Sequence, residues 1–135
     1  ISINSSFIND HIVKGIIPVI APLGRDEKGN TYNINADTAA GAIAGALRAS
    51  KLILLTDIAG ILDENKKLIS SLNYEEAKKI ISKNFILGGM KPKITTCIKA
   101  ISQGVKQATI LDGRIPHALI LELFTEHGIG TQIYT

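Results

Sequence analysis

Short runs of consecutive apolar residues, separated by segments with helical spacing, are the feature that most limits how this chain can fold. Residues 16–21, 51–57 and 105–111 are such runs, rich in aliphatic and β-branched side chains. This pattern is typical of strands buried on both faces of a parallel sheet. Residues 130–134 predict a last short strand. Strands that alternate with helices predict an α/β fold, in which a largely parallel sheet is sandwiched by helices.

Apolar periodicity and capping residues mark the helices between these runs. The first helix is expected to begin after Asn4 or Ser5. The others are expected at residues 38–47, 74–83, 92–103 and 115–126. Gly41 and Gly45 lie one turn apart in the second helix, which predicts close backbone packing against a sheet. A turn at residues 28–30 predicts a hairpin of two short edge strands.

Length, charge and hydropathy exclude several classes of protein. The 135 residues carry 15 Lys and Arg against 12 Asp and Glu, a net charge of +3. The basic residues fall in separate pairs without the aromatic side chains that stack on bases, so no nucleic-acid partner is expected. No apolar stretch reaches the ~20 residues of a membrane span, so no membrane partner is expected. The length fits one domain, residues 1–135. The chain begins at Ile1 without methionine or a targeting signal, which indicates a piece of something longer.

The cysteine and histidine content argues against a metal or redox site. Cys97 is the only cysteine, so neither a disulfide nor a cysteine-rich metal site is available. Its place in a predicted helix among isoleucines indicates a buried, unreactive thiol. His11, His117 and His127 are far apart, and none is spaced for metal binding with a second ligand.

Three polar clusters lie where ligands bind in α/β proteins, beyond strand ends and at helix starts. The first is Asn33, Asn35 and Asp37. Asp37 alone fits a plain N-cap, but three polar residues at alternate positions project to one side of an extended segment. An N-cap needs only one of them, so the cluster is a candidate binding segment.

The second cluster covers residues 56–62, at the end of a predicted strand. Thr56 and Asp57 can grip a ribose or a phosphate-bound metal, and Gly60 leaves room for backbone approach. A strand-ending turn in which Asp57 bonds to local amides explains the spacing equally well. Neither a G-x-G-x-x-G nor a Walker phosphate loop occurs in the chain.

The third cluster, residues 88–93, joins two glycines and two lysines at a helix entrance. Free amides and a lysine at such a point attract phosphate. A flexible loop with solvated lysines is the alternative, because the motif is weak by itself.

Taken together and in order, these blocks resemble the branch of the amino acid kinase family that phosphorylates N-acetyl-L-glutamate. The resemblance covers the whole chain and corresponds to the C-terminal, nucleotide-binding half. The matching blocks are residues 15–24, 33–40, 54–57, 88–93, 112–118 and 128–131. The resemblance implies transfer of a phosphoryl group from ATP, with Mg²⁺, to the γ-carboxylate of N-acetyl-L-glutamate. The product it implies is an acyl phosphate of arginine biosynthesis.

The resemblance also assigns roles to single residues. Asn33 would bind the acetylglutamate, with Asn35 supporting its loop. Asp37 would organise the catalytic lysines, and Lys93 would stabilise the charge on the transferred group. The nucleotide would be held by Thr56, Asp57, Ile58, Ala59, Gly60, Ile61, Leu62, Phe85, Ile86, Leu87, Gly89 and Met90.

The N-terminal substrate half of such enzymes, with its glycine-rich phosphate loop and second catalytic lysine, is absent from this sequence. The chain alone is therefore expected to bind nucleotide weakly and to turn over nothing. The resemblance further implies a homo-oligomer for the full enzyme, a PII-type regulator as a possible partner, and a cytoplasmic or plastid stromal location.

The C-terminal blocks are similar to the arginine-inhibited members of the branch, in which Glu122 and Gly128 would contact the effector. Thr109 departs from the histidine usual at its position. Two other interpretations stay open. One is another amino acid kinase, for carbamate, aspartate or uridylate, although residues 33–37 favour acetylglutamate. The other is a non-catalytic half that only binds nucleotide or a partner subunit.

Overall fold

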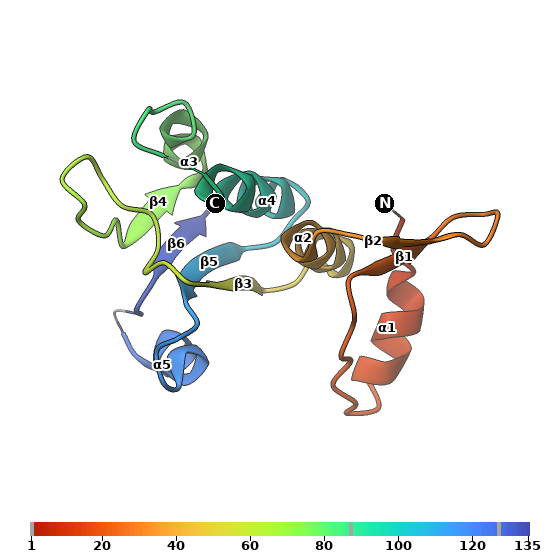
Figure 1. Ribbon diagram of the computed structural model, residues 1–135. Helices are drawn as coiled ribbons and strands as arrows, with labels where there is room; N and C mark the ends of the chain where they lie inside the picture. Colours follow the sequence, from red (N-terminus) through yellow and green to blue (C-terminus); the bar gives the residue numbers. More distant parts are fainter. Residues whose placement is uncertain (1, 87, 127) are drawn as a thin grey trace.

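A four-stranded sheet organises the computed structural model, which describes residues 2–86, 88–126 and 128–135 (Figure 1). The strand order is β3 (Lys51–Thr56), β5 (Gln107–Asp112), β6 (Thr131–Tyr134) and β4 (Ser71–Asn73). The β3–β5 and β4–β6 pairs are parallel, and the β5–β6 pair is antiparallel. The sheet is mixed but mostly parallel, which confirms the predicted α/β class.

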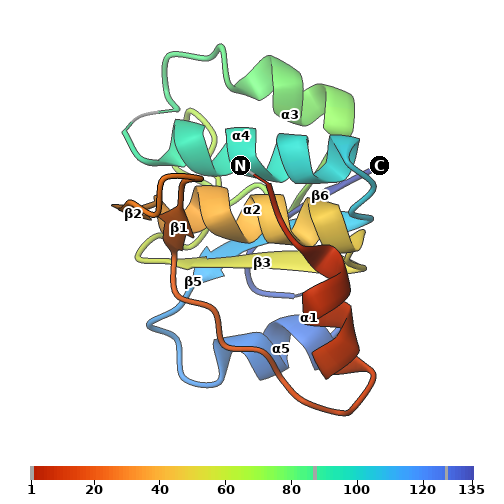
Figure 2. The same cartoon turned by 90° about the vertical axis from the view of Figure 1, so that its right-hand side faces the viewer.

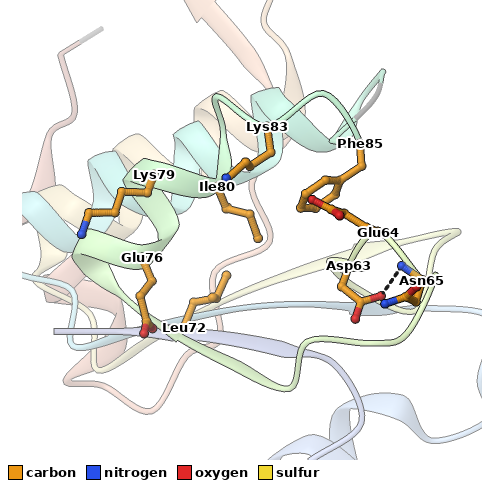
Figure 3. Close-up of a pocket in the computed structure, with 9 residues that line it drawn as sticks. All are labelled: Asp63, Glu64, Asn65, Leu72, Glu76, Lys79, Ile80, Lys83 and Phe85. Atoms are coloured by element: carbon orange, nitrogen blue, oxygen red, sulfur yellow. Dashed lines mark hydrogen bonds between the residues drawn. The ribbon is translucent and has the colours of Figure 1, made fainter.

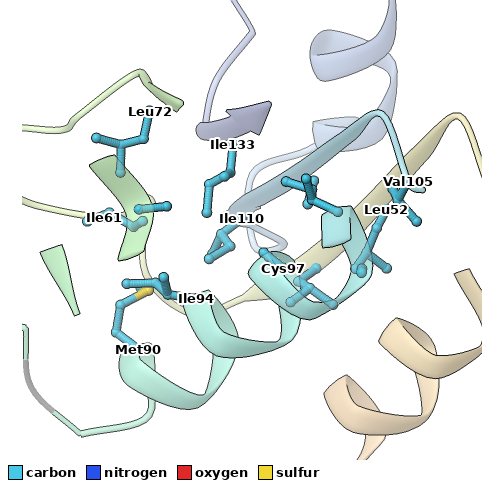
Figure 4. Packing of buried hydrophobic residues seen from close by; sticks show 14 of the residues in the cluster. Leu52, Ile61, Leu72, Met90, Ile94, Cys97, Val105, Ile110 and Ile133 are labelled. Atoms are coloured by element: carbon cyan, nitrogen blue, oxygen red, sulfur yellow. The ribbon is translucent and has the colours of Figure 1, made fainter. Parts of the chain in front are cut away.

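Helices cover both faces of this sheet. Three of them, α2 (Ala36–Leu47), α3 (Tyr74–Ile80) and α4 (Met90–Ser102), lie on one side, and α5 (Ala118–Phe124) lies on the other (Figure 2). The core forms where α4 meets the strands: Ile94 and Cys97 pack with Ile110 and Ile133 (Figure 4). All four side chains are fully buried, so the predicted burial of Cys97 is confirmed.

The N-terminal part is built from local elements. The helix α1 (Ser5–Ile12) is capped by Asn4, whose side chain accepts a hydrogen bond from Phe7 N. The strands β1 (Leu23–Arg25) and β2 (Thr31–Asn33) form an antiparallel hairpin. Both agree with the sequence pattern, including the turn at residues 28–30.

The predicted buried strand at residues 16–21 is wrong. This segment has no strand structure, and Ile17 and Val19 are 87% and 96% exposed. A strand is buried only when a neighbouring strand satisfies its amides and carbonyls. No strand among the described residues pairs with this segment. The sequence pattern reports hydrophobicity but not the presence of a partner.

A further difference concerns the packing of α2. Gly41 and Gly45 let α2 approach another helix, α4, rather than a sheet. A Cβ on Gly41 would lie 2.5 Å from Thr96 Cγ2, and one on Gly45 would collide with Gln103.

The helix predicted at residues 115–126 is shorter in the structure, because His117 takes a positive φ of 59° directly before α5. No helix in the described part of the chain has the length and apolar character needed to cross a membrane.

Candidate functional site

An ion pair between two helices brings together two of the polar clusters. Lys93 Nζ lies 2.8 Å from Asp37 Oδ2, joining the first turn of α4 to the first turn of α2. The two side chains are only 18% and 22% exposed. Because both charges are largely withdrawn from water, leaving either one without its partner would be costly. The pair therefore fixes a cation at the common end of α2 and α4.

Asn35, not Asp37, caps α2. Its side-chain oxygen accepts a hydrogen bond from Thr38 N at 3.0 Å. The simple N-cap explanation of Asp37 is thus wrong, and the Asp37 carboxylate is available to hold Lys93. Asn33 ends β2, two residues before the cap, and its side chain is exposed. The three polar residues thus lie at the end of β2, at the N-cap of α2 and in the first turn of α2, where Asp37 forms the ion pair.

The 56–62 segment lies at the carboxyl end of β3. Thr56 Oγ1 donates to Asp57 Oδ1 at 3.2 Å, while Gly60 takes a φ of 153°. A cavity of about 150 Å³ opens beside this loop. It is lined by Ile58, Gly60, Leu62, Phe85, Ile86 and Met90. All six are predicted nucleotide residues, so the fold brings together two segments that are separated in the sequence.

The remaining predicted nucleotide residues have different surroundings. Ala59 is exposed, Ile61 is fully buried and does not line the cavity, and Gly89 directly precedes α4 as its N-cap residue. Leu87 lies outside the described residues, as does His127.

A larger cavity of about 500 Å³ meets the first one at Phe85 (Figure 3). One wall is the 63–65 loop and the other is α3 with the turn that follows it. The lining residues are Asp63, Glu64, Asn65, Leu72, Glu76, Lys79, Ile80, Lys83 and Phe85. Sequence reasoning missed this cavity. The i, i+4 spacing of Lys79 and Lys83 in the predicted helix at residues 74–83 was the signal that could have pointed to it, although α3 itself ends at Ile80.

At the end of β5, Asp112 lies opposite Thr56 in the sheet register. The Arg114 guanidinium donates to both carboxylate oxygens of Asp112, at 2.9 and 2.7 Å. The side-chain hydrogen bonds from Arg114, with its backbone N–H and its charge, lower the pKa of Asp112 to about 2. The same pairing raises the pKa of Arg114. An ionised carboxylate is thereby fixed at the sheet edge beside Thr56 and Asp57.

Glu122 and Gly128, the predicted effector residues, come together on the α5 side of the sheet. The buried Glu122 carboxylate accepts from Lys51 Nζ at 3.3 Å, Thr109 Oγ1 at 3.1 Å and Ile129 N at 3.1 Å. A Cβ on Gly128 would lie 2.6 Å from Glu122 Oε2. Thr109, which departs from the expected histidine, thus serves as a hydrogen-bond donor to Glu122.

Neither a metal site of three or more protein ligands nor a reactive thiol is found in the described part of the chain. No group of three or more His, Cys, Asp or Glu side chains there is arranged to hold a metal ion. Burial, the largest cause, raises the pKa of Cys97 to about 12. The thiolate is the reactive form of cysteine, so this thiol is poorly suited to nucleophilic chemistry.

The architecture and the site define a helix-flanked α/β protein with an apolar cavity beside strand ends and a lysine fixed near a helix start. The model of the amino acid kinase family matches residues 1–112. The chain belongs to the amino acid kinase family.

Two acetylglutamate kinases illustrate its similarity to curated proteins. The one from Lawsonia intracellularis is 56% identical over 133 residues, which are 98% of this chain and 45% of that protein. The one from Acidiphilium cryptum is 61% identical over 120 residues, 89% of this chain and 40% of that protein. The chain thus spans less than half the length of these relatives. Both are bacterial proteins, and they give no support to a plastid location.

Solved structures show the same fold. N-acetylglutamate synthase from Neisseria gonorrhoeae, complexed with coenzyme A and N-acetyl-glutamate, matches with a TM-score of 0.92 and 30% identity. The match covers 98% of this chain and 31% of the synthase. Carbamate kinase from Giardia lamblia bound to AMP-PNP matches with a TM-score of 0.73 over 99% of this chain and 45% of that one. At 20% identity the latter supports the fold alone.

Proposed function

We propose that this chain supplies the nucleotide-binding half of an enzyme that phosphorylates the γ-carboxylate of N-acetyl-L-glutamate with ATP. The observation that carries the proposal is the Lys93–Asp37 ion pair, 2.8 Å long, on the helix that also lines the apolar cavity through Met90. The similarity to two acetylglutamate kinases supports the choice of acid, as does the N-acetyl-glutamate in the neisserial synthase.

In the proposed reaction a γ-carboxylate oxygen attacks the γ-phosphorus of ATP while the bond to the bridging oxygen breaks. ADP leaves with that electron pair, and N-acetyl-L-glutamyl 5-phosphate forms. The transition state carries charge on the equatorial oxygens, so catalysis depends on positioned cations. Lys93 would supply one such cation. Asp37 would keep the ammonium in place through the ion pair.

The other residues would bind and orient the two substrates. The apolar lining at Ile58, Phe85 and Ile86 suits an adenine ring, and the polar end at Thr56 and Asp57 suits a ribose or phosphates. Asn33 would donate to the acid. Mg²⁺, which proteins usually hold through one or two carboxylates together with substrate phosphates, would enter with ATP and neutralise phosphate charge. We place this reaction in the bacterial cytoplasm, where ATP is available.

A half that binds nucleotide without catalysing transfer is the second candidate, because the apolar cavity is lined entirely by residues of this chain. Homo-oligomer formation, PII-type regulation and arginine binding at Glu122 and Gly128 belong to the whole-enzyme proposal. Since the Glu122 carboxylate already binds Lys51, an arginine effector would have to share or replace that contact.

A hybrid enzyme tests the proposal. The part of the Lawsonia relative that precedes the matched region is joined to this chain, and acyl phosphate is trapped with hydroxylamine. Acetylglutamate should be the preferred acceptor over carbamate and aspartate. Lys93→Ala should lower kcat by about 100-fold or more, while thermal unfolding shows that the variant is folded.

Lys91→Ala is the matched control, because Lys91 is an exposed lysine in the same first turn of α4. It should leave kcat within about twofold of the parent, as expected for a surface change. An unchanged kcat in Lys93→Ala would contradict the assignment. Acyl phosphate made by the 135-residue chain alone would contradict the proposal that the chain supplies only half of the enzyme.

A further inference from the structure

Thr131, the first residue of β6, places a hydroxyl group behind the 57–62 loop. Its side chain is fully buried. The Oγ1 atom accepts a hydrogen bond from Ile61 N at 2.8 Å and donates one to Ile69 O at 2.6 Å. One hydroxyl therefore joins two segments of the chain to the sheet.

These two segments are the arms of a short hairpin. Ile69 N donates to Ile61 O at 2.8 Å, and Leu62 forms a β-bridge with Leu68. The outgoing arm carries Leu62 to the wall of the smaller cavity, and the tip carries residues 63–65 to the wall of the larger one. The position of both walls thus depends on how this hairpin is held against β6.

Gly60 shows how closely the loop approaches Thr131. A Cβ at Gly60 would lie 2.6 Å from Thr131 Oγ1 and 3.0 Å from Thr131 N. Its φ of 153° is also one that residues with side chains rarely adopt. The backbone therefore passes directly over Thr131 at the residue before the anchored amide. Space and conformation at Gly60 agree with the hydrogen bond at Ile61.

The hydroxyl is chemically suited to this double role. A threonine hydroxyl has one donor and two acceptor positions, so it can serve an N–H and a carbonyl together. Valine has the same shape but neither function, and it would leave a buried amide and a partly buried carbonyl without this partner. Leaving such groups unsatisfied is unfavourable, so the loop would move to find other partners. Serine keeps the hydroxyl and loses only a methyl group.

We propose that Thr131 is a positioning residue for nucleotide binding, acting through Ile61 and Ile69 on the cavity walls. It rests on the proposed function of the 57–62 loop. Thr131 lines neither cavity itself. Its loss should therefore weaken the nucleotide complex by displacing the loop, without removing any group that touches the nucleotide.

The test uses the 135-residue chain, labelled with ¹⁵N and titrated with MgATP, because chemical shifts report even weak binding. Thr131→Val should raise the Kd for MgATP about tenfold, which corresponds to 1.4 kcal/mol. Thr131→Ser should bind within about twofold of the parent, since the hydroxyl contact is retained. Amide hydrogen exchange at Ile61 should accelerate in Thr131→Val and stay slow in Thr131→Ser.

Thr109→Val is the matched control. Thr109 is also a fully buried strand threonine, but its hydroxyl bonds to Glu122 on the α5 side. It should lower stability without changing the Kd for MgATP. If Thr131→Val and Thr109→Val have the same effect on stability and on the Kd for MgATP, the role of Thr131 is purely structural and the proposal is overturned. If Thr131→Val does not fold, Thr131→Ala removes the same hydroxyl without pressing a methyl group against Ile61, and the same tenfold weakening is expected.

Two failures can be told apart. If the parent chain binds MgATP and a folded Thr131→Val or Thr131→Ala variant binds it equally well, the role of Thr131 is wrong and the proposed nucleotide site stands. If the parent chain shows no shift changes at Gly60 and Leu62 with saturating MgATP, the nucleotide site itself is wrong for this chain, and the role of Thr131 falls with it.

Discussion

Residues 2–35 and the described residues of 36–135 differ in how their side chains are buried. No residue of the first region is buried, and Phe7, Val13, Ile17 and Val19 are more than 60% exposed. Every member of the hydrophobic core cluster belongs to the second region. The first region is held by local hydrogen bonds, such as the Asn4 cap and the turn between β1 and β2.

This difference divides the candidate site. Asn33 and Asn35 come from the first region, whereas Asp37, Lys93 and the cavity walls come from the second. Short helices and two-stranded hairpins are marginal on their own. The residues expected to bind the nucleotide thus lie on elements that pack against the core, while the residues expected to contact the acid lie on elements with little burial.

The largest difference in the free energy of unfolding between the two regions is expected when the same substitution is made in each. Ile110 is fully buried in β5, whereas Ile17 is 87% exposed. Ile110→Ala should lower the free energy of unfolding by about 3–4 kcal/mol, because it removes buried methylene groups and leaves a cavity. Ile17→Ala should change it by less than about 0.5 kcal/mol. Urea unfolding followed by circular dichroism measures both values.

Both variants make the same Ile→Ala change, so the change in side-chain chemistry is matched and the two free energies can be compared directly. A loss of several kcal/mol from Ile17→Ala would mean that residues 16–21 are buried in solution, for instance against a second copy. Repeating the measurement over a range of protein concentrations would detect such an association, since the stability of an oligomer depends on concentration.

A smaller effect is expected from the helix caps. The Asn73 side chain caps α3 in a capping box with Glu76, and α3 packs on the core through Ala77 and Ile80. Asn73→Ala should lower the free energy of unfolding by about 1 kcal/mol.

Asn4→Ala removes the equivalent cap of α1, a helix without buried residues. It should reduce the helical signal of the folded protein and leave the urea midpoint of the core unchanged. If both variants shift that midpoint equally, α1 unfolds together with the core and the two regions are one cooperative unit.

The sequence predicted the elements whose signals are local and missed those that depend on distant partners. The Asn4 cap, the 28–30 turn and the buried run of β5 are all read from neighbouring residues. The absence of a strand at residues 16–21 could not be read in this way, because hydrophobicity does not show whether a partner strand is present. The three-residue strand β4 escaped notice because it is too short to show a period.

The candidate site shows the same limit. The segments 33–37, 56–62 and 88–93 were found from their composition and order. The ion pair of Lys93 with Asp37 depends on how closely α2 approaches α4, which Gly41 and Gly45 permit. The sequence showed the two glycines but not which element they face. The anchoring hydroxyl of Thr131 was likewise hidden, because Ile61 and Ile69 lie far from it in the chain.

The smallest expected effect is a difference in acid stability between two carboxyl groups. Hydrogen bonds from Arg114 lower the pKa of Asp112 to about 2, and hydrogen bonds from Asn30 lower that of Asp26. A carboxyl with a lowered pKa stabilises the fold above about pH 4 and loses this contribution as the pH falls through its folded-state value.

Asp112 ends a core strand, whereas Asp26 lies in the turn before β2. Asp112→Asn should therefore flatten the loss of global stability between about pH 4 and 2, by a small amount because solvent screens the pair. Asp26→Asn should leave that curve unchanged and alter only the NMR signals of the hairpin, such as those of Tyr32, whose hydroxyl donates to Asp26. Urea midpoints measured across this pH range compare the two variants. Equal flattening by both would show that the hairpin is lost together with the core, because only a hairpin that unfolds with the core can pass its titration on to global stability.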